Sequence, residues 1–226
     1  LHTCIGILAA IIQRQSTGVG QQVEVAQQES VENLLRIHLR ETYATGKAAP
    51  RQGNRSAPAA PSNIYRCSPG GPNDYVFIHC ATVDMWKALT RIVGRPEMAD
   101  DPRYHDRRDR VQIVDEIDVM IEAWTEKRDK HEVMAIMAGA GVPCGAVLDS
   151  TEILADPHLR KRRFIVDLEH PRRGPYPMPG NPVRLSDSPT EVARPPLLGE
   201  HNTEVYGHLL GIKPDQVAQL KRDGII

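Results

Sequence analysis

The chain has 226 residues, of which 40% are hydrophobic and 25% charged, and its formal net charge is −1. These values are typical of a globular protein, and the lack of a basic excess argues against a general nucleic-acid binder. No apolar run reaches the roughly eighteen residues that a membrane span needs. We therefore expect no nucleic-acid partner, no membrane-embedded segment and a cytoplasmic location.

The N-terminal part of the chain has helical and strand-like patterns. Apolar residues recur at spacings of three and four over residues 1–15, which predicts a helix with one buried face. Residues 22–26 alternate polar and apolar side chains and predict a short strand. Residues 29–43 are again periodic as in a helix. This order indicates part of an α/β layer, whose remaining strands must come from elsewhere.

A change of composition divides the chain after this part. Residues 44–63 are dominated by Pro, Ala, Gly, Ser and Asn without periodicity, which predicts a linker. Two strand-like runs follow, joined by "PGGPN", and predict a hairpin over residues 64–68 and 74–81. Three helices are expected next, over residues 83–93, residues 107–124 and from Asp129 to a stop at Gly141.

Two short helical turns are expected within residues 150–162. The second has Asp156 as its N-cap and Pro157 as its first helical residue, the position that proline favours. Alternating side chains over residues 164–170 then predict a strand.

The end of the chain is predicted to be extended and then helical. Residues 171–199 are rich in Pro and Gly and predict a return linker, with a short strand possible at residues 183–185. The segments "EHNTEVYGHLLG" and "PDQVAQLKRDG" predict two short helices.

The residues that usually carry metal or nucleophilic chemistry are scattered. The nine histidines form no pair at metal-binding spacing, and the four cysteines form no C-x-x-C pair, so we predict no metal site and reduced, mostly buried thiols. Cys144 in "GVPCGAV" has no base nearby, and we interpret that segment as a helix cap followed by a turn. The basic run Arg160–Arg163, with Arg172 and Arg173, is either a solvated surface or an anion site for cofactor phosphates.

Several segments together resemble the class III CoA-transferase family. They include "IGILAAIIQRQSTGVGQQVEVAQQESVENLLRIHL", "GRPEMADDPRY", "AGVPCGAVLDSTEILADPHLRKR", "HPRRGPYPMPGNPVRLSDSP" and "PPLLGEHNTEVYGHLLG". They span nearly the whole chain in the family's order. The variant "SVENLLRIHLRE" is most similar to the formyl-CoA transferase branch.

The resemblance implies an α/β fold with an incomplete Rossmann-like large domain and a small α+β domain. Residues 1–43 and 200–226 would belong to the large domain, and residues 64–170 to the small one. Residues 44–63 would be the linker and residues 171–199 the return linker. Two such chains interlock as a homodimer in the family.

The resemblance also implies an acyl-CoA:carboxylate CoA-transferase. In the family an Asp carboxylate attacks the thioester of the acyl-CoA, forms an aspartyl-CoA intermediate and passes CoA to a small carboxylic acid. The CoA thioester is a substrate, and no metal is needed. That Asp lies a few residues before the segment matching "LHTCIGILAA", so no catalytic residue is assigned here, and we expect this chain alone to be inactive.

The family's active-site loop, a run of glycines before the first strand of the small domain, corresponds in position to Pro58, Ala59 and Ala60. These are the candidate substrate-binding residues. Because the glycine run is absent from "NRSAPAAPSN", the acyl donor and acceptor stay open. Two alternatives also stay open: an α-methylacyl-CoA racemase of the same fold, and a non-catalytic truncated module for folding or dimerisation. Dimerisation or aggregation is expected because the helix over residues 1–15 would lack its sheet.

Overall fold

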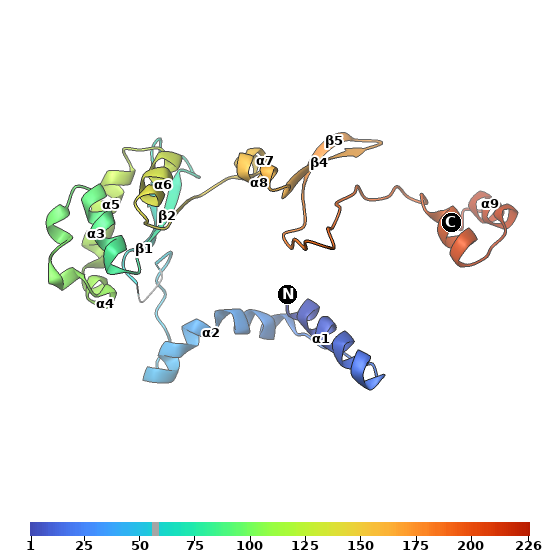
Figure 1. The fold of residues 1–226 in the computed structure, drawn as a ribbon, viewed down its shortest axis with the longest axis horizontal. Helices are drawn as coiled ribbons and strands as arrows, with labels where there is room; N and C mark the ends of the chain where they lie inside the picture. Colours follow the sequence, from blue (N-terminus) through green and yellow to red (C-terminus); the bar gives the residue numbers. More distant parts are fainter. Residues whose placement is uncertain (56–58) are drawn as a thin grey trace. The chain divides into compact units, whose positions relative to one another are not determined.

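The computed structural model describes residues 1–55 and 59–226. Figure 1 traces the elements along the chain, from α1 (His2–Thr17) and α2 (Gln27–Thr45) to the C-terminal α9 (Pro214–Arg222). Helix α1 ends at Gly18, whose φ of 71° is a left-handed conformation that glycine adopts without strain. The two N-terminal helices predicted from periodicity are confirmed.

Two expectations for the N-terminal part are wrong. Residues 22–26 form no strand, since no strand in the described ranges pairs with them. Within those ranges no residue of α1 or α2 is buried either, although the periodicity predicted a buried face for residues 1–15. Ile5 and Ile12 are each 66% exposed. The apolar stripe is present, but the described residues do not cover it.

A three-stranded sheet with the order β1-β2-β3 follows the segment of residues 46–61. Strands β1 (Ser62–Arg66) and β2 (Tyr75–His79) form the predicted hairpin, in which the Cys67 N–H donates to the Asp74 carbonyl at 2.8 Å. Strand β3 (Cys144–Ala146) was not predicted, because "GVPCGAV" was interpreted as a cap and turn. Three residues are too few to show a period of two, so the pairing partner decides the conformation.

Helices follow β2. Helix α3 (Val83–Ile92) confirms the predicted helix over residues 83–93, and α6 (Lys130–Gly139) confirms the one beginning at Asp129. The single helix expected over residues 107–124 is wrong, because it is broken by a 3₁₀ turn. This region contains the short elements η1 (Pro96–Met98), η2 (Pro102–Tyr104), α4 (Arg107–Arg110) and η3 (Val111–Ile113), and η3 leads into α5 (Val114–Thr125).

The described chain forms two compact units, which are considered separately. The first contains Leu1–Tyr65, Phe77–Trp124 and Ile136–Cys144. The second contains Arg66–Val76, Thr125–Ala135 and Gly145–Ile226. The first unit has a core of fully or nearly fully buried apolar side chains from its strands and helices: Tyr65, Ile78, Cys80, Trp86, Leu89, Ile117, Ile121, Met137 and Val142. Burying these side chains stabilises the unit by about 1.5–3 kcal/mol for each large apolar group.

In the second unit a buried lysine links three segments. Lys130 is 4% exposed, and its ammonium donates to the carbonyls of Asn73 (3.3 Å) and Val147 (2.8 Å). Its third partner is the carboxylate of Glu152, at 2.7 Å. Glu152 also accepts the Asp149 N–H in a capping box at the start of α7 (Ser150–Ala155). The charge of Lys130 is therefore paired as it enters the interior.

The remaining elements of this unit match the prediction in part. Helix α8 (Pro157–Lys161) begins as expected, with the Asp156 carboxylate accepting the Leu159 N–H at 2.7 Å. Strand β4 (Ile165–His170) is also confirmed. The helices predicted near the C-terminus are present as a π-helix over Thr203–Leu209 and as α9.

Strand β5 (Gly174–Pro179) corrects the predicted return linker, and no strand forms at residues 183–185. β5 pairs antiparallel with β4, from Ile165 opposite Pro179 to His170 opposite Gly174. Pro175, Pro177 and Pro179 are spaced by two, and the Gly180 N–H points inward to the Phe164 carbonyl. The backbone nitrogens of the three prolines, which carry no hydrogen, therefore face away from β4. A strand tolerates proline on such a free edge.

No helix in the described part of the chain is long and apolar enough to cross a membrane.

The thiols of Cys4, Cys67 and Cys80 should differ in reactivity. Burial, as the largest cause, raises the pKa of Cys67 to about 11 and that of Cys80 to about 12, whereas Cys4 is exposed on α1. Because the thiolate is the nucleophile, iodoacetamide at pH 7.5 should alkylate Cys4 first. Mass spectrometry of peptides after timed quenching checks this, with urea-unfolded chain as control. Equal rates at all three positions in the folded chain would contradict the packing described.

The second unit should lose stability in acid through Glu152. The hydrogen bond from Lys130 is the largest cause that lowers the pKa of Glu152 below its ordinary value of 4.5. A lowered folded-state pKa contributes stability that is complete above the unfolded value and is lost as pH falls through the folded value. The protection factors of the α7 amides, which compare the exchange rate with that of an unfolded peptide at the same pH, should therefore fall below about pH 4.5. Glu152→Gln should weaken protection at pH 7 and flatten this dependence, whereas an unchanged pH profile would argue against the pairing.

Candidate functional site

Ala59 and Ala60, two of the three candidate residues, lie in a pocket of the first unit. Pro58 lies outside the described residues. The pocket is lined by Pro50, Arg51, Gln52, Arg55, Ala59, Ala60, Val111 and Val114. Residues with small and branched apolar side chains form one part of the lining, and Arg51 and Arg55 form another. Such a lining suits a ligand that carries an anionic group on a short apolar body.

The wall formed by Ala60 is fixed by a buried arginine. Arg110 is fully buried, and its Nε donates to the Ala60 carbonyl at 2.5 Å. Its Nη1 donates to the carbonyls of Tyr104 (2.7 Å) and His105 (3.2 Å), and its Nη2 to that of Cys80 (3.2 Å). The guanidinium therefore links the residues just before β1 with the residue just after β2 and with the turn before α4.

The Arg110 charge is held by dipoles and an aromatic ring. Its guanidinium carbon lies 4.9 Å from the centre of the Trp86 ring, a cation–π distance. Burial lowers the pKa of Arg110, but a guanidinium titrates so far above neutrality that it stays charged. Trp86 is itself anchored, since its Nε1 donates to the Met98 carbonyl at 3.0 Å. The wall at Ala60 is thus attached to a fully buried and hydrogen-bonded cation.

A second part of the pocket lining is attached to α5 through Arg55. The Arg55 Nε donates to Asp118 at 2.8 Å and its Nη2 to Asp115 at 2.6 Å, both on α5. These ion pairs raise the pKa of Arg55, with the hydrogen bond to Asp115 as the largest cause. Burial, followed by the hydrogen bond to Asp118, raises the pKa of Tyr65, which therefore stays a neutral donor. These four charged residues were not identified from the sequence as part of a site: Arg51, Arg55, Arg110 and Asp118. Residues 51–55 were interpreted only as part of the linker over residues 44–63.

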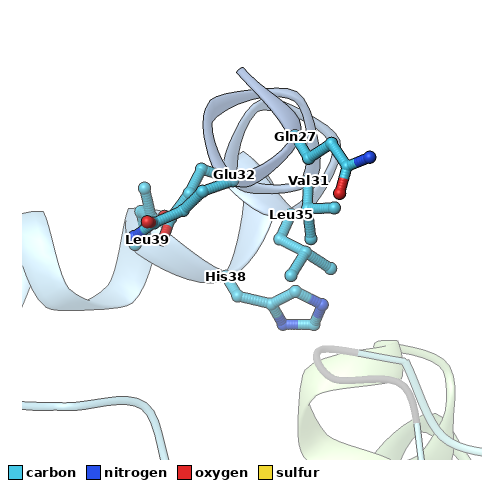
Figure 2. A pocket seen from close by; sticks show the side chains of 7 residues that line it. Gln27, Val31, Glu32, Leu35, His38 and Leu39 are labelled. Carbon is cyan, nitrogen blue, oxygen red and sulfur yellow. The ribbon is translucent and has the colours of Figure 1, made fainter. Parts of the chain in front are cut away.

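A second surface depression lies on α2. Its lining residues, among them Val31, Leu35 and His38, come from this one helix. Figure 2 shows the labelled side chains extending from α2 alone. Because nothing opposes them in the described ranges, this depression is part of the exposed apolar face of α2. It offers no convergent polar groups of the kind that orient a ligand.

The basic residues singled out in the sequence do not gather at one point. Arg160–Arg163 adjoin the start of β4, and Arg172 and Arg173 lie in the turn between β4 and β5. The two groups are separated by the length of β4, about 17 Å at the usual rise per residue. Arg160 is also paired with Asp167 at 2.8 Å. One anion site made of all six residues is therefore not formed.

Among residues 1–55 and 59–226, no three His, Cys, Asp or Glu side chains are grouped as a metal site would require.

Comparisons with known proteins identify related sequences over the whole chain. The model of CoA-transferase family III matches residues 1–202. A formyl-CoA:oxalate CoA-transferase of Streptomyces avermitilis is 39% identical over 239 residues, covering 100% of this chain and 58% of that protein. One from Bradyrhizobium sp. is 37% identical over 245 residues, covering 100% of this chain and 57% of its own length. The chain thus spans less than two thirds of these relatives.

Solved structures give the same picture at the level of the fold. A CAIB/BAIF family protein from Brucella suis is similar with a TM-score of 0.70 and 27% identity, over 91% of this chain and 52% of that one. A Mycobacterium tuberculosis protein, Rv3272, is similar in fold, with a TM-score of 0.68 at 20% identity over 88% of this chain and 51% of that one.

Arg110 should be among the most sensitive positions of the first unit. Arg110→Met keeps much of the side-chain volume but leaves several buried carbonyls without donors, each costing about 1–3 kcal/mol. We expect a loss of about 3 kcal/mol or more in the free energy of unfolding, measured by urea denaturation followed by tryptophan fluorescence. The surface variant Arg108→Met is the control. Equal stability of the two variants would contradict the role assigned to the buried guanidinium.

Proposed function

The chain belongs to CoA-transferase family III, and from this membership we propose that it is part of an acyl-CoA:carboxylate CoA-transferase of the formyl-CoA:oxalate type. The observation that carries the proposal is the identity of 39% with such an enzyme across the entire chain. The pocket at Ala59 and Ala60 supports it, because guanidinium groups beside small apolar side chains suit a short carboxylate.

In the proposed reaction, an Asp carboxylate outside these 226 residues attacks the carbonyl carbon of the acyl-CoA. The thiolate leaves to give a mixed anhydride, then returns to form an aspartyl-CoA thioester and release the first acid. The second acid attacks this thioester and expels the CoA thiolate, which gives a second mixed anhydride. The thiolate then attacks the acyl carbon of the second acid, so that the new acyl-CoA forms and the Asp carboxylate is regenerated. The residues of this chain contribute binding: Arg51 provides a positive charge that attracts the acid, and the wall at Ala59 and Ala60 limits its size. The charge of Arg55, also in the lining, is compensated by Asp115 and Asp118.

The wider organisation belongs to the same proposal. Residues 1–43 and 200–226 would be parts of a large domain, residues 64–170 a small domain, and residues 44–63 and 171–199 the linkers between them. The enzyme would work in the cytoplasm as an interlocked homodimer. The exposed apolar faces of α1 and α2 support burial in a larger assembly, because contiguous apolar surface of this kind is usually covered.

A transfer assay tests the proposed function. The purified complete gene product that contains this chain should form oxalyl-CoA from formyl-CoA and oxalate, measured by liquid chromatography. The 226-residue chain under the same conditions should form none, because the proposed nucleophile lies outside it. If other short acids accept CoA and oxalate does not, those acids replace oxalate as the proposed acceptor. Racemisation of a 2-methylacyl-CoA without transfer, or transfer by the 226-residue chain, would contradict the proposal.

A further inference from the structure

We propose that Asp118 is a positioning residue for the pocket at Ala59 and Ala60, and that it acts through Arg55. The inference rests on the function proposed above, since it assigns a role within the same site. It concerns the wall formed by residues 50–55, which the buried Arg110 does not touch.

The Asp118 carboxylate is bonded at both oxygens. Its Oδ1 accepts the Tyr65 hydroxyl at 2.6 Å, and its Oδ2 accepts the Asn63 amide at 3.0 Å and the Arg55 Nε at 2.8 Å. Tyr65 is 1% exposed, and Asn63 lies beside it in β1. Because the strand and α5 hold the carboxylate on two sides, its position is set by the core of the unit.

Arg55 connects the fixed Asp118 carboxylate to the pocket. Arg55 is one of the lining residues of the pocket, and its N–H donates to the Gln52 carbonyl at 3.2 Å. That bond closes a turn at Gly53, whose φ is 62°. A shift of the Arg55 side chain therefore moves the turn and the neighbouring Arg51. The pocket keeps its width only if the Arg55 side chain stays bonded to the carboxylates of α5.

The neighbouring Asp115 provides a matched comparison. Both carboxylates lie on α5, one turn apart, and both bond Arg55. The Asp115 side chain is 85% exposed, whereas that of Asp118 is 13% exposed. Water and salt screen an exposed pair, and such a pair contributes little to a fixed geometry. Asp118 should therefore determine where Arg55 lies, although the two distances are similar.

Kinetics of the complete gene product test the functional part. Asp118→Asn keeps the shape of the side chain but removes its charge, and an amide N–H₂ group then competes for the place facing Arg55. We expect KM for the acceptor acid to rise about tenfold with kcat within about twofold, because the substrate is held less well while the reacting groups are unchanged. Asp115→Asn, with the same change of charge, should leave both constants within about twofold.

Hydrogen exchange on the 226-residue chain tests the structural part without any activity. In Asp118→Asn, the Arg55 amide should exchange several-fold faster, while the amides of α3 stay protected. Asp115→Asn should match the unmodified chain. Tyr65→Phe removes one bond to Asp118 and leaves the ion pair with Arg55, so it should have a smaller effect at Arg55 than Asp118→Asn.

The outcomes separate this inference from the proposed function. An unmodified gene product that transfers no CoA overturns the function, and exchange at Arg55 still decides whether Asp118 holds the wall. Equal effects of Asp118→Asn and Asp115→Asn, or no effect of either, overturn the positioning role. If the amides of α3 also lose protection in Asp118→Asn, that variant disturbs the whole unit. The variants Arg55→Lys and Arg55→Gln are then measured in its place. Loss of acid affinity in Arg55→Gln with partial rescue by Arg55→Lys supports the inference, and equal affinities overturn it.

Discussion

The first unit depends on one buried cation that has main-chain carbonyls as its partners. The Arg110 guanidinium is taken out of water and stabilised by carbonyls from three separate parts of the chain and by the face of Trp86. Each carbonyl needs a donor as much as the guanidinium needs acceptors, so the interaction fixes positions as well as charge. Because the Ala60 carbonyl is one of these acceptors, the wall of the candidate pocket at Ala60 is rigid.

The sequence predicted those elements whose conformation is decided by their own residues. The helices α3 and α6 and the N-cap at Asp156 follow from the spacing of apolar side chains and from local capping, and they were predicted. Strands β3 and β5 depend on distant partners, and they were not predicted. Three prolines argued against β5, and only its pairing with β4 reveals that they lie on the free edge.

For the candidate site, the family resemblance suggested residues, and the charged groups around them were not predicted. Resemblance to a family pointed to Ala59 and Ala60, and both line a pocket. The charged residues around them were not distinguished, because a run such as "DRRDR" does not say which arginine is buried. Arg108 is exposed and pairs with Asp106, whereas Arg110 two residues later is fully enclosed. Burial is decided by the three-dimensional environment, and single-sequence patterns do not record it.

The proline spacing of β5 has a consequence for the behaviour of the chain in concentrated solution. A two-stranded sheet has two free edges, and a free edge can pair with a strand of another molecule. Along the outer edge of β5, Pro175, Pro177 and Pro179 have no N–H groups to offer such a strand. The same residues that hid the strand in the sequence thus protect this edge from intermolecular sheet extension.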